Sequence, residues 1–369
     1  MSNPVLAEWN KFRREIRPAL PGLHLVVAVA VVARYLHSFI PNAMLARAIS
    51  EVFIAVFLGL YIRNVVRFSA RFEPGVKFAL QRILRWGIIL LGLRLSLQDV
   101  VATGLEALLL IGACMTLALT LAYLGGRFLR IPLRLATLIG VGTAVCGNTA
   151  IVATAPVIEA KDEDVSIAVA TITFFGTLAV LLYPIIGYFA GLSDRVFGLW
   201  VGTAVNDTSQ VVAAGAAFSE VARDVATVVK LTRNTLMVPI IIVIGIVYAR
   251  SQNRRTPGAA TKFSFSKVVP WFVIGFLLMT LVRTVGVALG VLPQDVNHPG
   301  QLQGAANVLI FVDEIAKFFI LMALSAIGLS TDASAVRRTG IRPFALGVGV
   351  ASILAVFSLG LILLTGLGR

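Results

Sequence analysis

The chain of 369 residues is 58% hydrophobic and only 14% charged, whereas soluble domains average roughly 45–50% apolar and about 25% charged residues. With a mean hydropathy of +0.91, this composition excludes an ordinary soluble globule and indicates an all-α polytopic membrane protein. The net charge of +14 would favour nucleic acid as a partner of a soluble protein, but in a membrane protein it is typical of basic cytoplasmic loops.

Eleven apolar runs predict the membrane-spanning helices. They divide the chain into a cytoplasmic N-terminal segment at 1–21, eight spans within 22–249, a hydrophilic cytoplasmic linker at 250–267, and three spans within 268–369. In chain order the predicted spans cover residues 22–40, 49–66, 84–97, 104–126, 135–159, 165–191, 196–218, 225–249, 268–292, 303–329 and 343–366.

The orientation follows from the basic residues of the connectors. If the eleven spans alternate and the N-terminus is cytoplasmic, 22 Lys and Arg residues fall on the cytoplasmic side and 5 on the other. The positive-inside rule therefore predicts a cytoplasmic N-terminus and a C-terminus on the opposite side of the membrane. Since topology accounts for the charge, no nucleic-acid partner is expected, and the lipid bilayer is the expected surrounding.

Two similar segments are predicted to break their helices at membrane depth. Residues 142–149 (GTAVCGNT) resemble residues 202–209 (GTAVNDTS), which are followed by Gln210. Glycine and small polar residues weaken a helix, and a break inside a membrane is tolerated only where protein or water satisfies the freed backbone groups. Broken helices direct positive helix ends at a guest, which favours an anion. The alternative is close helix packing through small residues.

Internal repeats are also predicted. Residues 86–104 resemble residues 318–340, and the two junctions fall on opposite sides of the membrane, as an inverted repeat requires. With one span between them, the segments 142–149 and 202–210 would run in the same direction. They are inverted partners only if one of them is re-entrant.

Two basic residues lie deep in the predicted eighth span. Lys230 and Arg233 are three residues apart and share one helical face, and no acidic residue is near them on their own helix. A guanidinium binds oxyanions through two hydrogen bonds, and a lysine adds a point charge. The charge of this pair is balanced by Asp207 on the preceding span, by acidic residues of the predicted tenth span, or by a bound anion. We predict that the pair supplies positive charge to a small oxyanion, and Arg233→Ala is expected to abolish transport in a folded protein.

Three carboxylates at membrane depth are candidates for ion coupling. They are Asp207, Asp313 and Glu314, although Asp313 and Lys317 also have the spacing of an internal ion pair. An intramembrane enzyme would need a facing pair, and the neighbours Asp313 and Glu314 diverge by about 100° on a helix. No nucleophile triad, phosphate loop or metal-ligand spacing is present. We therefore expect no enzyme activity and no cofactor, with H⁺ or Na⁺ as the coupling ion.

Three stretches resemble a known family. Residues 140–187, 202–215 and 229–239 (VKLTRNTLMVP) are similar to the sulfate exporter family of bacterial inner-membrane proteins, and the resemblance extends over nearly the whole chain. It implies a location in the bacterial inner membrane, with the predicted C-terminus on the periplasmic side, and a relation to the cation/proton antiporter and bile-acid symporter group. For that group it implies two broken helices that cross at the midplane, an elevator mechanism and a homodimer.

The sequence thus predicts a secondary transporter of a small anion such as sulfate, sulfite or an organosulfonate. The alternatives are an anion channel and an ion-coupled organic-anion symporter or antiporter of the same fold. Asn206 stands where the family usually has a histidine, so proton coupling through a histidine is not expected at this position. Asn148 and Thr149 stand where the family usually has small apolar residues, and the added amides and hydroxyl favour a larger or more polar substrate such as an organosulfonate. The predicted substrate-binding residues are Cys146, Gly147, Asn148, Thr149, Asn206, Asp207, Thr208, Ser209, Gln210, Lys230 and Arg233.

Overall fold

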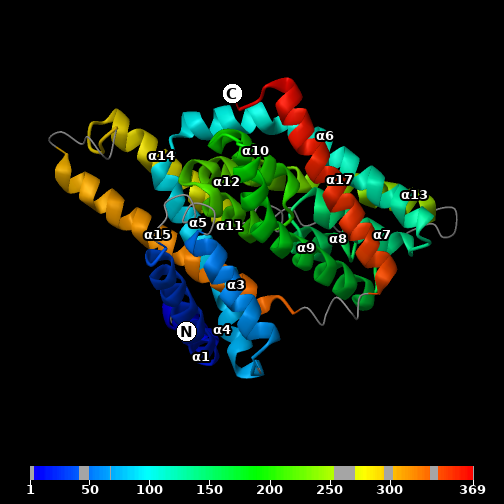
Figure 1. The fold of residues 1–369 in the computed structure, drawn as a ribbon, viewed down its shortest axis with the longest axis horizontal. Coiled ribbons are helices and arrows are strands. Elements are labelled where there is room, and N and C mark those ends of the chain that lie inside the picture. Colours follow the sequence, from blue (N-terminus) through cyan, green and yellow to red (C-terminus); the bar gives the residue numbers. More distant parts are fainter. Residues whose placement is uncertain are drawn as a thin grey trace. The chain divides into compact units, whose positions relative to one another are not determined.

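The computed structural model describes residues 4–40, 50–66, 68–252, 271–294, 302–332 and 340–368, and all regular structure in these ranges is helical (Figure 1). Most of the predicted linker 250–267 lies outside the described residues. The elements are α1 (Pro4–Ser38), α3 (Glu51–Asn64), η1 (Ala70–Phe72), α4 (Glu73–Phe78), η2 (Ala79–Ile83), α5 (Leu84–Leu91), η3 (Gly92–Arg94), α6 (Leu97–Phe128), α7 (Leu133–Ala144), α8 (Asn148–Thr154), α9 (Asp162–Phe189), α10 (Asp194–Ala204), α11 (Thr208–Phe218), α12 (Glu220–Thr235), α13 (Met237–Gln252), α14 (Trp271–Ala288), α15 (Gln303–Ser330) and α17 (Ile341–Thr365).

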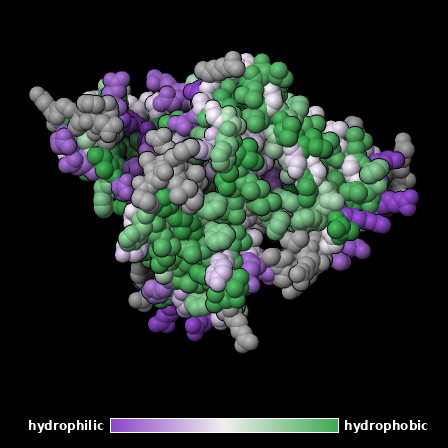
Figure 2. Space-filling view, in the orientation of Figure 1, coloured by the Kyte–Doolittle hydropathy of each residue, from purple (hydrophilic) through white to green (hydrophobic). Residues whose placement is uncertain are grey.

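Six helical stretches among the described residues are long and apolar enough to cross a membrane, so the predicted count of eleven spans is not confirmed. They are Ile16–Ser38, Leu97–Phe128, Asp162–Phe189, Glu220–Tyr248, Trp271–Ala288 and Ile341–Thr365. Large apolar side chains on them are exposed, with Leu109, Phe128 and Leu364 each more than four-fifths accessible. Figure 2 shows broad hydrophobic areas on the face in view. Such a surface is suited to lipid.

The chain forms two compact units. Unit 1 comprises Met1–Leu95 and Gly275–Asp332, and unit 2 comprises Ser96–Ile274 and Ala333–Arg369. The predicted segment 22–249 therefore contributes to both units. In unit 1, α3 and α15 pack backbone to backbone, because a Cβ on Gly59 would lie 2.6 Å from the Ser325 carbonyl and one on Gly328 would lie 2.2 Å from that of Val56. Small residues allow this approach in membrane helices.

In unit 2 the first predicted broken span is a re-entrant hairpin. Hairpin 1 consists of α7, residues 145–147 and α8. Arg134 near its start forms an ion pair with Glu159 beyond its end, at 3.6 Å, whereas a continuous helix would separate these residues by ~37 Å. Gly142 on α7 also faces Ile151 on α8. The prediction of a break is confirmed, but the prediction of a membrane span at 135–159 is corrected.

The second broken span has the same form. Hairpin 2 consists of α10, residues 205–207 and α11. The ring of Phe197, near its start, stacks on that of Phe218 at its end with centroids 4.0 Å apart, whereas a continuous helix would separate them by ~32 Å. The predicted span at 196–218 is therefore also a hairpin that returns to the side from which it starts.

The two hairpins enter unit 2 from opposite ends of α6. The open end of hairpin 1 lies beside the C-terminal end of α6, where a Cβ on Gly126 would contact Ala136. The open end of hairpin 2 lies near the start of α6, where Arg195 forms an ion pair with Glu106. Opposed entry is the arrangement that an inverted repeat would produce, although the repeat itself stays a prediction.

Re-entry changes the sidedness of two connectors. Under the predicted orientation, the connector with Lys161 moves to the cytoplasmic side and the connector with Arg195 moves to the opposite side. Each side thus loses one basic residue and gains one, and the split of 22 to 5 is unchanged. The charge bias was unable to distinguish hairpins from spans for this reason.

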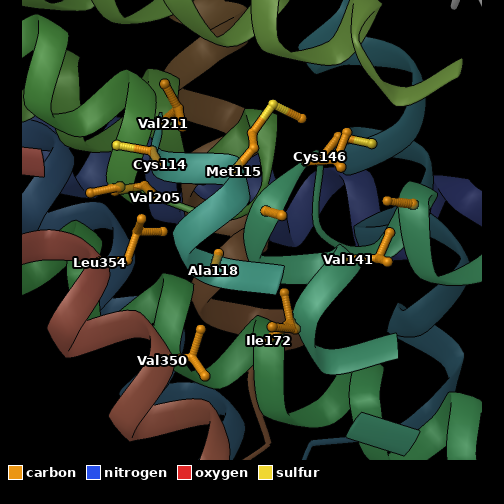
Figure 3. Packing of buried hydrophobic residues seen from close by; sticks show 14 of the residues in the cluster. Cys114, Met115, Ala118, Val141, Cys146, Ile172, Val205, Val211, Val350 and Leu354 are labelled. Atoms are coloured by element: carbon orange, nitrogen blue, oxygen red, sulfur yellow. The ribbon is translucent and has the colours of Figure 1, made fainter. Parts of the chain in front are cut away.

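The core of unit 2 surrounds the tips of both hairpins. Buried side chains from α6, α7, α9 and α17 meet there with Cys146 and Val205, which lie in the two breaks (Figure 3). Cys114, Met115 and Ala118 form the α6 side of this cluster. The breaks are therefore enclosed by protein, which is the condition under which an interrupted helix is stable at membrane depth.

The re-entrant topology predicts a labelling pattern. In a cysteine-free background, we expect Arg127→Cys and Lys161→Cys to react with an impermeant maleimide from one side of the membrane, and Asp194→Cys and Glu220→Cys from the other. All four positions are exposed. Eleven alternating spans would instead group residue 127 with 194 and residue 161 with 220, and that result would contradict the hairpins.

Candidate functional site at the hairpin tips

The tips of the two hairpins touch at Gly147 and Asp207. Gly147 has φ of +64°, and a Cβ at this position would lie 3.2 Å from both Cα and Oδ2 of Asp207. Glycine tolerates this backbone conformation and leaves room for the close approach. The two segments that resemble each other in sequence are therefore brought together in space.

Lys230 on α12 joins the two hairpins through their backbones. Its ammonium donates to Val145 O at 2.8 Å, to Val205 O at 3.2 Å and to Asn206 O. The side chain is fully buried. Val145 follows the last residue of α7 and Val205 follows that of α10, so the lysine lies where two negative helix ends meet.

Arg233, one turn further along α12, binds the same two helix ends. Its Nε donates to Ala144 O at 2.7 Å, and one terminal nitrogen donates to Thr203 O at 2.9 Å and to Val205 O at 3.0 Å. Further bonds reach the carbonyls of Thr143 and Gly202. The sequence interpretation gave this guanidinium to the substrate, whereas in the structure its hydrogen bonds go to backbone carbonyls that a broken helix leaves without partners.

Asp207 caps α11. Its Oδ1 accepts from the Ser209 backbone N–H at 2.9 Å and from the Ser209 hydroxyl at 2.7 Å, and the Asp207 N–H donates to Gln210 Oε1 at 3.2 Å. This is a capping box, which stabilises the start of a helix. The positive end of α11 is thus already occupied by a carboxylate of the protein.

Thr173, in the middle of α9, contacts both hairpins and was missed by sequence reasoning. Its hydroxyl accepts from Asn148 Nδ2 at 3.2 Å, and its carbonyl accepts from Gln210 Nε2 at 3.1 Å. The Gln210 side chain fits because Gly176 has no Cβ, which would lie 1.7 Å from Gln210 Oε1. The threonines at 171, 173 and 177 within an apolar helix are the sequence signal that could have indicated this contact.

Several polar groups near the tips keep hydrogen-bonding capacity. Thr149 is exposed, and Asn148 and Thr208 are half-buried. Among the described residues, the side-chain oxygens of Asn206 and Asn234 are buried and lack a partner, although the Asn234 amide donates to Thr208 Oγ1 at 3.3 Å. Buried amide oxygens without a hydrogen-bond partner are unusual in proteins. They mark the surroundings of Thr208 as a place where a ligand or water would be bound.

Cys146 lies in the first break but faces the packed interior. Its side chain is 5% exposed, and its sulfur lies 3.4 Å from the Met237 sulfur. Within the described structure, Cys146 is therefore one of the predicted binding residues with little access to a ligand, together with Asn206, Gln210, Lys230 and Arg233. Its contact with α13 is one of packing.

The predicted coupling carboxylates Asp313 and Glu314 belong to unit 1. Asp313 forms ion pairs with Lys317 at 2.9 Å and with Arg94 at 3.3 Å, and Glu314 lies 3.1 Å from Lys317. The ion-pair alternative of the sequence analysis is confirmed for Asp313. Their role in coupling stays a prediction.

Comparison with known proteins finds one protein family and several relatives that match most of the chain. The family described as conserved hypothetical protein 698 matches residues 21–347. The chain is 31% identical over 346 residues to a UPF0324 membrane protein of Clostridium tetani, covering 91% of this chain and 94% of the relative. It is 32% identical to one of Fusobacterium nucleatum, covering 93% and 97%, and 36% identical to one of Streptococcus pyogenes serotype M6, covering 89% and 92%. These relatives are similar along almost their whole length.

Proposed function

Because the chain belongs to the UPF0324 membrane protein family, we propose that it is a secondary transporter of a small anion, with sulfate, sulfite and organosulfonates as the first candidates. The observation that carries the proposal is the pair of opposed hairpins whose tips meet at Gly147 and Asp207. Broken helices that meet within the membrane are the usual location of transporter substrate sites. The sulfate exporter name rests on the sequence resemblance alone.

The charges around the tips favour an anion. Lys230 and Arg233 are buried, and within the described structure Asp207 is the one carboxylate at the hairpin tips that they hold. Three carbonyl oxygens surround the Lys230 nitrogen, and they match an ammonium, which has three donors and no acceptor. Two cations against one carboxylate leave one positive charge, and an anion of the substrate would balance it.

We propose that the two cations attract the anion without touching it. Their donors are held by backbone carbonyls, so the direct contacts come from neutral groups. Thr149, Asn148 and Thr208 are the accessible donors near the tips. In this proposal Lys230 and Arg233 attract the anion by their charge and do not bind it directly, whereas the sequence had predicted direct binding. Asp207 is the candidate for proton coupling.

The proposal extends to the mechanism as the resemblance implies it. Hairpin 1 and hairpin 2 would move with the rest of unit 2 as an elevator, in a homodimer at the bacterial inner membrane. We propose no catalytic role and no cofactor. An anion channel would differ in its kinetics, because it shows no saturation and no counter-transport.

A thermal-shift screen of anions tests the function. A ligand that binds only the folded protein raises its melting temperature by a saturable amount, so sulfate, sulfite or a sulfonate is expected to stabilise the purified protein over chloride at equal ionic strength. Thr149→Val is expected to raise at least threefold the anion concentration that gives half of the maximal shift in melting temperature. The control is Thr116→Val, which changes an exposed threonine on α6 and is expected to keep the wild-type response. Absence of any anion response, or flux in liposomes that neither saturates nor shows counter-transport, would contradict the proposal.

A further inference from the structure

The ammonium of Lys230 lies among backbone oxygens of the two hairpin tips, in a position that a free cation could occupy. The three oxygens around the Lys230 nitrogen come from both breaks: Val145 O from hairpin 1, and Val205 O and Asn206 O from hairpin 2. Among the described residues, Lys230 has no carboxylate within ion-pair distance, so backbone carbonyls are its partners. The ammonium thus links two segments that no covalent bond joins directly.

Backbone carbonyls at broken helices bind metal ions in other membrane proteins. Unwound carbonyls and the C-terminal ends of half-helices coordinate Na⁺ in transporters, and rings of carbonyls replace the hydration shell of K⁺ in channels. Here two such helix ends converge, which concentrates negative potential at one point. A positive charge at this point stabilises the contact of the tips, whether it is a free ion or a side chain.

We propose that Lys230 is a tethered cation that fills a monovalent-cation site between the hairpins, so that the protein holds its tips together without Na⁺ or K⁺. The inference deepens the proposed function, since it assigns no coupling Na⁺ to these carbonyls. It does not depend on the identity of the substrate.

Removing the ammonium should convert the position into a site for a free ion. In Lys230→Ala the carbonyls of Val145 and Asn206 lose their donor, the carbonyl of Val205 keeps only Arg233, and a space of lysine size opens. We expect this variant to melt below the wild type in N-methyl-D-glucamine chloride. Adding NH₄Cl, KCl or NaCl at constant ionic strength should raise its melting temperature saturably by about 3–6 °C for the best-fitting cation.

The control is Lys161→Ala, which removes an exposed lysine at the start of α9. This variant and the wild type are expected to respond to the same cations by less than about 1 °C. An equal response in Lys230→Ala and Lys161→Ala would overturn the proposal.

A second measurement uses only the wild-type protein, so it can be made even if Lys230→Ala does not fold. Binding of ²²Na⁺ or ⁸⁶Rb⁺ to purified wild-type protein is expected to be absent, and one ion per chain would overturn the proposal. Neither measurement contains a transport substrate. Failure of the anion screen would therefore reject the proposed function while leaving this result unaffected.

Discussion

Replacing Arg233 by methionine is expected to destabilise unit 2 severely. The guanidinium is 1% exposed and donates to carbonyls of both α7 and α10, and each buried acceptor left without a donor costs roughly 1–3 kcal/mol. We therefore expect the free energy of unfolding to fall by at least ~3 kcal/mol, which corresponds to a fall of about 6–12 °C in melting temperature. Size-exclusion profiles and thermal melts in detergent measure the effect.

The control for this substitution is Arg127→Met. Arg127 is exposed near the end of α6, and its guanidinium donates to the Tyr123 hydroxyl at 3.4 Å. Its replacement is therefore expected to lower the free energy of unfolding by only about 0–1 kcal/mol. The sequence alone predicted a folded but inactive Arg233→Ala protein. A variant at residue 233 that melts like the wild type and has lost only transport would restore that interpretation.

Gly147→Ala is expected to separate the hairpin tips. The added methyl would lie 3.2 Å from Asp207 Oδ2, and the backbone has φ of +64°, so steric crowding adds to conformational strain. We expect the free energy of unfolding to fall by about 2–4 kcal/mol. We also expect the variant to show no rise in melting temperature when the anion is added. Thermal melts with and without the best anion of the screen provide the measurement.

Gly191→Ala is the matched control. Gly191 has φ of +63°, but no atom lies within 4 Å of the position that an added methyl would take, so the substitution carries the backbone strain of about 1–2 kcal/mol without the crowding. The difference between the two variants measures the crowding between the tips together with the strain specific to the Gly147 backbone, which has ψ of −125°. Equal melting temperatures would show that the approach of Gly147 to Asp207 contributes nothing to stability.

Part of the candidate site was predictable because it depends on local sequence. The segments 142–149 and 202–210 combine glycine with small polar residues in apolar surroundings, and both contain the predicted breaks. Asp207 and Gln210 form a capping box, whose spacing is a property of a single helix start. Local patterns of this kind do not need the rest of the fold.

The partners of Lys230 and Arg233 were not predictable. Sequence shows that two buried cations need negative partners, and a bound anion was the simplest candidate. The structure supplies seven backbone carbonyls instead, from residues 143–145, 202, 203, 205 and 206. Backbone carbonyls have no signature in composition or charge, so only the fold reveals which of them lack a helical partner.

The sequence by itself determined that this is a membrane protein and located the helix breaks, because composition and short-range pattern set both. Only the tertiary structure decided that each broken segment turns back. Hydropathy is the same for one long span and for two half-length helices, and the exchange of Lys161 for Arg195 leaves the charge bias unchanged. The return of the chain is fixed by distant contacts such as Arg134 with Glu159 and Phe197 with Phe218, and these contacts form only in the folded protein.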